Sequence, residues 1–188
     1  MADQTVEMGT PICWADTTDY DNTNSGITRT HQITLAALAS AAARQGAKAD
    51  LGANRAAGYA VKVGIEMDVA PVAGAPVEFY WSSSYSGTAA VGNDGGASVT
   101  GADAAWVPGG GAEADIDEWK RQLTFIGILP LAADAATAYQ VGMINSYFSP
   151  PTRYGQVVVK NGGGQAFEGD DVEMYIALIP IIDDGALA

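Results

Sequence analysis

Few side chains in this sequence are capable of acid–base or nucleophilic chemistry. There is one histidine, His31, and one cysteine, Cys13. A Ser–His or Cys–His arrangement would depend on His31 alone, and no nucleophile elbow, P-loop or dinucleotide fingerprint is present. The glycine clusters at 109–111 and 162–164 lack the following lysine or helix that a phosphate site requires. We therefore interpret His31 as structural or exposed, and Cys13 beside Trp14 as a small buried hydrophobe.

Carboxylates are the remaining catalytic candidates, because two of them suffice for glycoside hydrolysis. Most acids here lie in loops or at alternating strand positions that should face solvent, such as Glu66, Asp68 and Glu173. The sequence therefore predicts a protein that is not an enzyme and that uses no cofactor.

A dense group of oxygen ligands near the N-terminus could hold Ca²⁺. It comprises Asp16, Asp19, Asp21, Asn22 and Asn24. The spacing does not match an EF-hand loop, and no acid follows at the closing position of such a loop. We expect an Asx-rich surface turn, with calcium binding as the alternative.

The elements that must position these side chains are mostly strands. Apolar residues alternate with polar or small ones over 59–69 and 77–81, which is the period of a strand with one buried face. Further strands are predicted at residues 139–147, 154–160 and 172–178. Residues 122–131 are apolar at both parities, which predicts a central strand covered on both sides.

Two segments lack the strand period. Residues 1–43 are predicted to form an N-terminal arm, with a possible short helix in the alanine-rich stretch 33–44. Residues 83–118 are rich in glycine, which predicts one long excursion outside the core. Residues 44–188 are predicted to form a single domain.

Strands separated by Gly and Pro turns, without a βαβ rhythm, predict an all-β fold. The long excursion and long connections favour a jelly-roll-like β-sandwich with an N-terminal arm. A lipocalin-like closed barrel is the alternative.

The charge of the chain restricts its partners. It has nine Lys and Arg residues against 22 Asp and Glu residues, for a net charge of −13 over 188 residues. Nucleic acids and anionic membranes are not expected as partners, because binding them requires cations. The acidic N-terminus does not resemble a signal peptide, and no apolar run reaches the ~18 residues of a membrane span.

One segment departs from this acidic balance. Residues 27–62 contain five basic residues and one acid. We expect four of these cations to lie toward an acidic partner, namely Arg44, Lys48, Arg55 and Lys62. The alternative is a set of solvated faces.

Aromatic residues suggest a second contact region. Trp81 shares the parity of Phe79 and should be buried, which leaves Tyr80, Tyr85 and Trp106 for a surface. We expect Tyr85 and Trp106 to contact a partner or a neighbouring subunit. A sugar-stacking platform is the alternative.

Longer stretches of the sequence resemble a family of small virion structural proteins of tailed bacteriophages. The stretches are Tyr59–Ser84, the glycine-rich Gly92–Trp106, FSPPTRYGQVVVKNGGGQAF at Phe148–Phe167 and DDVEMYIALIPIIDD at Asp170–Asp184. The resemblance covers residues 44–184 and consists of strand and turn patterns. It transfers no site residue.

The resemblance implies a jelly-roll domain that decorates or cements a capsid, often as a trimer. The expected partners are then the major capsid protein lattice and other copies of the chain. The expected location is the capsid surface of a virion, after synthesis in the host cytoplasm. The alternatives are a carbohydrate-binding jelly roll and a structural protein of the tail, neck or fibre.

Overall fold

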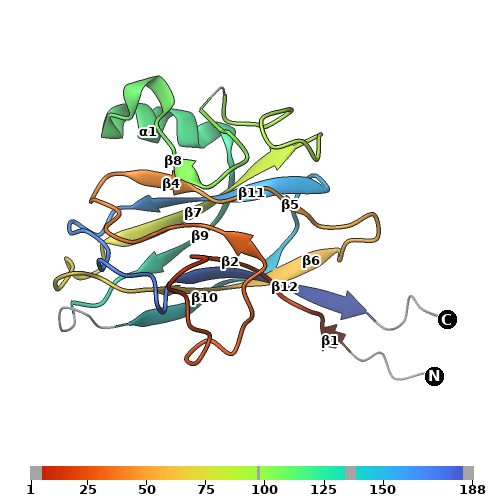
Figure 1. The fold of residues 1–188 in the computed structure, drawn as a ribbon, viewed down its shortest axis with the longest axis horizontal. Helices are drawn as coiled ribbons and strands as arrows, with labels where there is room; N and C mark the ends of the chain where they lie inside the picture. Colours follow the sequence, from red (N-terminus) through yellow and green to blue (C-terminus); the bar gives the residue numbers. More distant parts are fainter. Residues whose placement is uncertain (1–5, 97, 134–138, 184–188) are drawn as a thin grey trace.

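A computed structural model describes residues 6–96, 98–133 and 139–183, which form two β-sheets packed face to face (Figure 1). Eight strands form the framework: β2 (Ile12–Ala15), β4 (Ala43–Gln45), β6 (Gly58–Ile65), β7 (Pro76–Ser84), β9 (Thr124–Pro130), β10 (Gln140–Phe148), β11 (Tyr154–Asn161) and β12 (Tyr175–Asp183). The short elements are β1 (Val6–Met8), β3 (His31–Gln32), β5 (Ala49–Asp50), β8 (Ala104–Ala105), the helix α1 (Glu113–Trp119) and the 3₁₀ turns η1 (Pro108–Gly110) and η2 (Lys120–Gln122).

The strand order is that of a jelly roll. One sheet has the order β10-β6-β12-β2 and the other the order β4-β11-β7-β9, with every one of these pairs antiparallel. The short strands extend these sheets at their edges or pair with β11 and β12. The predicted jelly-roll-like sandwich is confirmed, and the closed barrel is wrong because the strands divide into two separate sheets.

The central core lies between the two sheets. It contains the large aromatic side chains Trp14, Phe79 and Trp81, all fully buried. The prediction that Phe79 and Trp81 point to the same, buried face of their strand is confirmed. A Cβ atom at Gly155, on the neighbouring strand β11, would overlap the Trp81 ring, so the packing of that indole requires glycine there.

Two smaller clusters cover the outer faces of the sandwich. Val99, Trp106 and Ile116 pack with Tyr80 and Val158 on the outer face of one sheet. On the other sheet, Cys13, Ala15 and Ile27 pack with Tyr175 and Ala177. As a result β6, β11 and the first half of β12 (Tyr175–Leu178) are buried on both faces, although the alternation at 59–69 and 172–178 predicts one exposed face for β6 and for β12.

The N-terminal segment differs from the prediction. Residues 33–42 contain turns instead of a helix, and they lead into β4. Ala37 and Ala41 adopt positive φ angles of 52° and 66°, which are incompatible with a right-handed helix. Strands β2 and β4, before residue 46, pair within opposite sheets, so this segment is interwoven with the sandwich.

The mid-chain excursion and the apolar strand at 122–131 also differ from expectation. The excursion contains β8 and α1 and forms its own core on the sandwich, and Trp106 is only 1% exposed. The predicted surface position of Trp106 is therefore wrong. Strand β9 lies at the end of its sheet, with β7 as its ladder partner, so the prediction of a central strand is wrong.

Candidate interaction surface

The strands β9 and β10 lie next to each other where the two sheets meet at one side of the sandwich (Figure 1). The Asn145 side chain donates a hydrogen bond of 2.8 Å to the Ile126 carbonyl, which links the two strands. Their backbones approach closely at Gly127, where a Cβ would lie 2.8 Å from the Ile144 carbonyl oxygen. The two strands therefore form one edge of the sandwich. Phe125 and Ile128 lie on the outer face of one sheet, beside Tyr80 and Glu78. Val141 and Met143 lie on the outer face of the other sheet, beside Gly64 and Lys62.

This edge of the sandwich carries five large apolar side chains, each about half exposed. They are Phe125 (54%), Ile128 (45%), Val141 (50%), Met143 (53%) and Tyr147 (58%). We refer to these five residues as the β9–β10 edge. Scattered single apolar residues are ordinary on a protein surface, whereas several on two adjacent strands indicate a contact site.

Strand pairing explains why these side chains point outward. On β10, Val141 and Met143 pair with Gly64 and Lys62 of β6, while the intervening Gly142 lies against the buried Leu129. The alternation of a strand thus turns Val141 and Met143 away from the core.

The β9–β10 edge is also free of charge. Neither strand contains an ionisable acid, a histidine or a basic residue, and Asp134 is the one charged residue between Arg121 and Arg153. In a chain of net charge −13, this is a long neutral interval. The sequence already held this signal, in the combination of missing charge with apolar residues at both parities.

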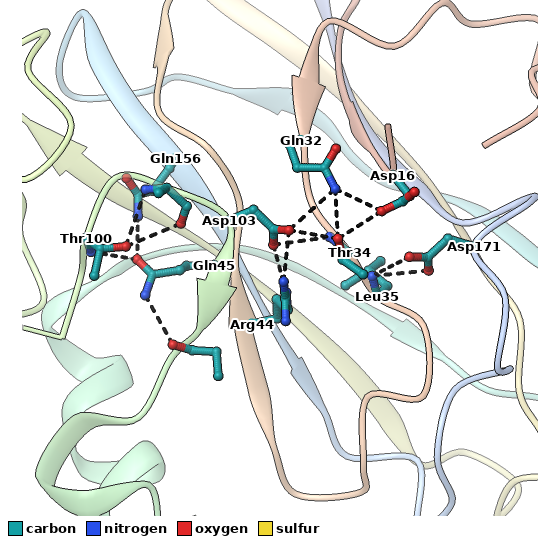
Figure 2. Close-up of polar contacts among 12 residues, drawn as sticks. Asp16, Gln32, Thr34, Leu35, Arg44, Gln45, Thr100, Asp103, Gln156 and Asp171 are labelled. Atoms are coloured by element: carbon teal, nitrogen blue, oxygen red, sulfur yellow. Dashed lines mark hydrogen bonds and ion pairs between the residues drawn. The ribbon is translucent and has the colours of Figure 1, made fainter. Parts of the chain in front are cut away.

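The predicted partner-contact residue Arg44 lies in an internal network (Figure 2). Its guanidinium donates to both carboxylate oxygens of Asp103, at 2.7 and 2.8 Å. Asp103 also accepts hydrogen bonds from the Thr34 backbone N–H and from the Gln32 side chain, which donates to Asp16 as well. The Thr34 hydroxyl lies within hydrogen-bond distance of both carboxylates and donates its single proton to one of them at a time. Burial alone would raise the pKa of Asp103, but the hydrogen bonds from Arg44 and Thr34 outweigh it and hold that pKa below its usual value. The network thus fixes the excursion to the N-terminal strands.

A second part of Figure 2 ties the excursion to the sheet below it. The buried Gln45 amide accepts hydrogen bonds from the Thr100 backbone and the Gln156 side chain, and it donates to the Ser98 carbonyl. Glutamine supplies both a donor and an acceptor here, so it bridges a strand and a loop.

The other three predicted cations occupy different environments. The Lys48 ammonium donates to Ser84 Oγ and to three backbone carbonyls of the 86–91 loop, so it organises that loop. Arg55 donates to the Pro151 carbonyl at 3.3 Å. Lys62 lies on β6, with its ammonium 6.0 Å from the Tyr175 ring centroid, beside Met143. The structure does not gather the four cations into one patch.

Of the two predicted contact aromatics, Tyr85 is exposed and Trp106 is not. Tyr85 is 80% exposed and borders a hollow of about 350 Å³ that Arg153 and Tyr154 also line. The Arg153 guanidinium lies 4.9 Å from the Tyr154 ring centroid and so already stacks on that ring.

The N-terminal carboxylates form Asx turns, as predicted. Asp16 accepts from the backbone N–H groups of Thr18 and Asp19, and Asp21 accepts from that of Thr23. Burial opposes ionisation of Asp16, but its hydrogen bonds lower its pKa to about 2. No group of three or more candidate metal-binding side chains occurs in the described ranges.

His31 and Cys13 have structural environments. The His31 ring lies 5.2 Å from the Trp14 ring, and its Nδ1 is 2.8 Å from Thr30 Oγ1. Burial lowers the pKa of His31. Burial also raises the pKa of the Cys13 thiol to about 12, so the reactive thiolate is scarce at neutral pH.

Known protein families, curated proteins and solved structures provide no match to this chain. The functional argument therefore depends on the residues themselves. Among the described residues, no helix has the length and apolar character needed to cross a membrane.

Proposed function

We propose that this protein is a non-enzymatic structural component of a virion, most specifically a decoration or cement protein of a tailed-phage head. The observation that carries the proposal is the set of half-exposed apolar side chains on the uncharged strands β9 and β10, in a jelly roll of net charge −13. A protein that joins an assembly needs such a contact surface, together with solubility before assembly. The sequence resemblance to virion structural proteins supports the same function.

The environments of the polar residues favour this proposal over catalysis. Asp16 and Asp103 share hydrogen-bond donors inside the fold, and His31 packs on Trp14. These groups hold the chain together, which is the role expected in a structural protein.

Reconstitution on particles tests the proposal. Purified protein is mixed with phage heads stripped of decoration proteins, and its occupancy is measured by sedimentation and by electron microscopy. We expect saturable binding at symmetric lattice positions and an increase in the heat resistance of the heads. If the protein does not bind heads but binds tails or fibres, it is a structural component of another part of the virion.

A second candidate function, sugar binding, has one observation in its favour. Among the described residues, Tyr85 is the most exposed of the large apolar side chains, and it borders a hollow. The stacked Arg153 covers the adjacent Tyr154 ring, which leaves one free aromatic platform in place of two. Binding to immobilised glycans that disappears in Tyr85→Ala would support this candidate.

A further inference from the structure

We propose that a cavity at one end of the sandwich binds a small alkyl carboxylate. The cavity has a volume of about 580 Å³, a size that proteins use to bind small molecules. It lies where the start of β2, the loop between β5 and β6, and the end of β12 come together (Figure 1). This site goes beyond the proposed function, because the decoration of a capsid does not require a small-molecule ligand.

The wall of this cavity is mostly aliphatic. Leu51 and Tyr59 belong to the central core, and Ile12 packs against that core. Pro180 and Ile182 of β12 add further apolar surface. The cavity therefore continues the central core outward, and an apolar ligand would be buried against it in the same way as a core side chain.

The side chains of the wall favour an alkyl chain over an aromatic ring. An aromatic ligand gains from stacking on an exposed ring. Tyr59 is the one aromatic side chain among the described residues that line the cavity, and it is 1% exposed, so it offers little ring surface for stacking. A flexible alkyl chain can follow the irregular aliphatic wall instead.

Charge indicates that the ligand is an anion. Arg55 is the only charged residue among the described residues that line the cavity, although the chain contains 22 Asp and Glu residues. Arg55 forms no ion pair with a carboxylate of the described chain, whereas Arg44, Arg153 and Lys160 each form one. A guanidinium without a counter-ion beside an apolar cavity favours a ligand with a carboxylate at one end.

The hydrogen bonds of Arg55 favour the same ligand. Its Nη2 donates to the Pro151 carbonyl at 3.3 Å, which is long for such a bond. Its Nη1 is buried and has no acceptor among the described residues, which costs free energy. A carboxylate binds a guanidinium through two parallel hydrogen bonds, so it would supply the missing acceptor when this long side chain turns toward the cavity.

The test titrates the isotope-labelled, full-length protein with octanoate at pH 7 and follows its amide resonances by nuclear magnetic resonance. Saturable shifts should centre on residues 51–59 and on the parts of β2 and β12 that line the cavity. The dissociation constant should be on the order of 1 mM. In decanoate and dodecanoate, each added CH₂ group should tighten binding about 4-fold until the cavity is filled.

A neutral ligand and a charge variant test the role of Arg55. Octan-1-ol has the same chain without the charge, and it should bind about 10-fold more weakly than octanoate. Arg55→Gln should remove this preference, because glutamine can donate a hydrogen bond but has no charge. Arg121→Gln is the matched control, since it removes the same charge from an exposed residue outside the cavity, and it should leave both affinities unchanged.

A filling variant tests the cavity itself. Ala56 is partly buried, lines the cavity and packs against the central core. Ala56→Phe should therefore weaken the binding of octanoate and octan-1-ol alike. Circular dichroism checks that this variant is folded, and Ala57→Phe, at an exposed position of the same wall, replaces it if it does not fold.

Several results would overturn the site. They are an absence of saturable shifts up to ~10 mM octanoate, equal affinities of the wild-type protein for octanoate and octan-1-ol, and shifts that centre on the β9–β10 edge. A failure to bind phage heads in the reconstitution experiment would contradict the proposed function and leave this site unaffected, because the titration requires no particle.

Discussion

Two ion pairs of similar geometry occupy different environments in this protein. Arg44 and Asp103 form a bidentate pair with side chains 25% and 13% exposed, and Arg153 and Asp50 form one with side chains 44% and 46% exposed. Removing one partner from a partly buried ion pair lowers protein stability more than removing one from an exposed pair. The reason is that the remaining charge has no counter-ion and is less well hydrated than a charge at an exposed site.

We predict that Asp103→Ala lowers the free energy of unfolding by about 2–4 kcal/mol, since it leaves the Arg44 guanidinium and the Thr34 backbone N–H without their acceptor. Asp50→Ala is the matched control and should stay close to wild type, because solvent screens an exposed pair. Urea denaturation followed by circular dichroism measures both. Equal losses in the two variants would contradict the argument from burial.

Asp171 gives the protein a specific pH dependence. Burial, followed by repulsion from Asp16 and Asp19, raises the pKa of Asp171 to about 6, although its carboxylate accepts the Leu35 N–H. The folded state then binds more protons than the unfolded state between the unfolded value, 3.8, and about 6. The free energy of unfolding should therefore decrease as pH rises through this window, by up to about 3 kcal/mol.

Asp171→Asn tests this pH dependence, since it cannot ionise and retains one acceptor oxygen. Thermal unfolding between pH 4.5 and 7 should show a flatter profile in this variant than in the wild-type protein. The same slope in both proteins would mean that another group titrates in this window.

Among the secondary-structure elements, the long strands could be predicted from the sequence, and the short N-terminal strands could not. Alternation placed β6, β7 and β12 near their observed positions, because each is long enough to show a period of two. Strand β11 was located by its apolar run between Pro150–Pro151 and the glycine turn at 162–164. Strands β2, β3 and β4 have two to four residues, too few to show any period. Burial of their side chains depends on distant partners, such as the pairing of β2 with β12.

The candidate site was likewise predictable only in part from the sequence. The neutral, apolar character of residues 122–131 was visible in the sequence, but its position at a sheet edge depends on strand order, which local patterns do not encode. Trp106 was placed wrongly because glycine-rich segments are usually loops, whereas this one folds back on Tyr80 and Val158. Arg44 was interpreted as a partner contact because its ion-pair partner, Asp103, is 59 residues away.

Two buried tryptophans, Trp14 in the central core and Trp106 in the excursion, should respond differently to replacement by phenylalanine. Trp14 Nε1 donates to the Ala47 carbonyl at 2.7 Å, which joins β2 to the segment after β4. Trp106 Nε1 has no acceptor among the described residues. We predict that Trp14→Phe costs about 1 kcal/mol more than Trp106→Phe, since it alone removes a hydrogen bond, the one that the partly buried Ala47 carbonyl accepts.

Chemical denaturation of the two variants measures this difference. Each substitution removes a similar volume from a side chain that is at most 1% exposed, so the comparison isolates the hydrogen bond. A larger loss in Trp106→Phe would indicate that the excursion core tolerates cavities less well than the central core.

For the whole molecule, net charge controls solubility. The charge of −13 at pH 7 opposes nonspecific association of the chains, and it falls to zero near the pI of about 4.1. We predict a solubility minimum close to pH 4.1 that reverses on return to pH 7, measured as turbidity at ~1 mg/ml. Constant solubility from pH 3.5 to 7 would show that charge repulsion does not keep the chains apart.

The pairing of β1 with β12 brings the beginning and the end of the described chain together. Val6 lies opposite Asp183, on adjacent strands of one sheet. Joining the two ends with a short linker and opening the chain in the exposed turn at 72–74 would preserve every strand pair of the jelly roll. The order of the strands along the chain can therefore be changed without changing their order in space, and a peptide fused before β1 or after β12 would project from the same edge of the molecule.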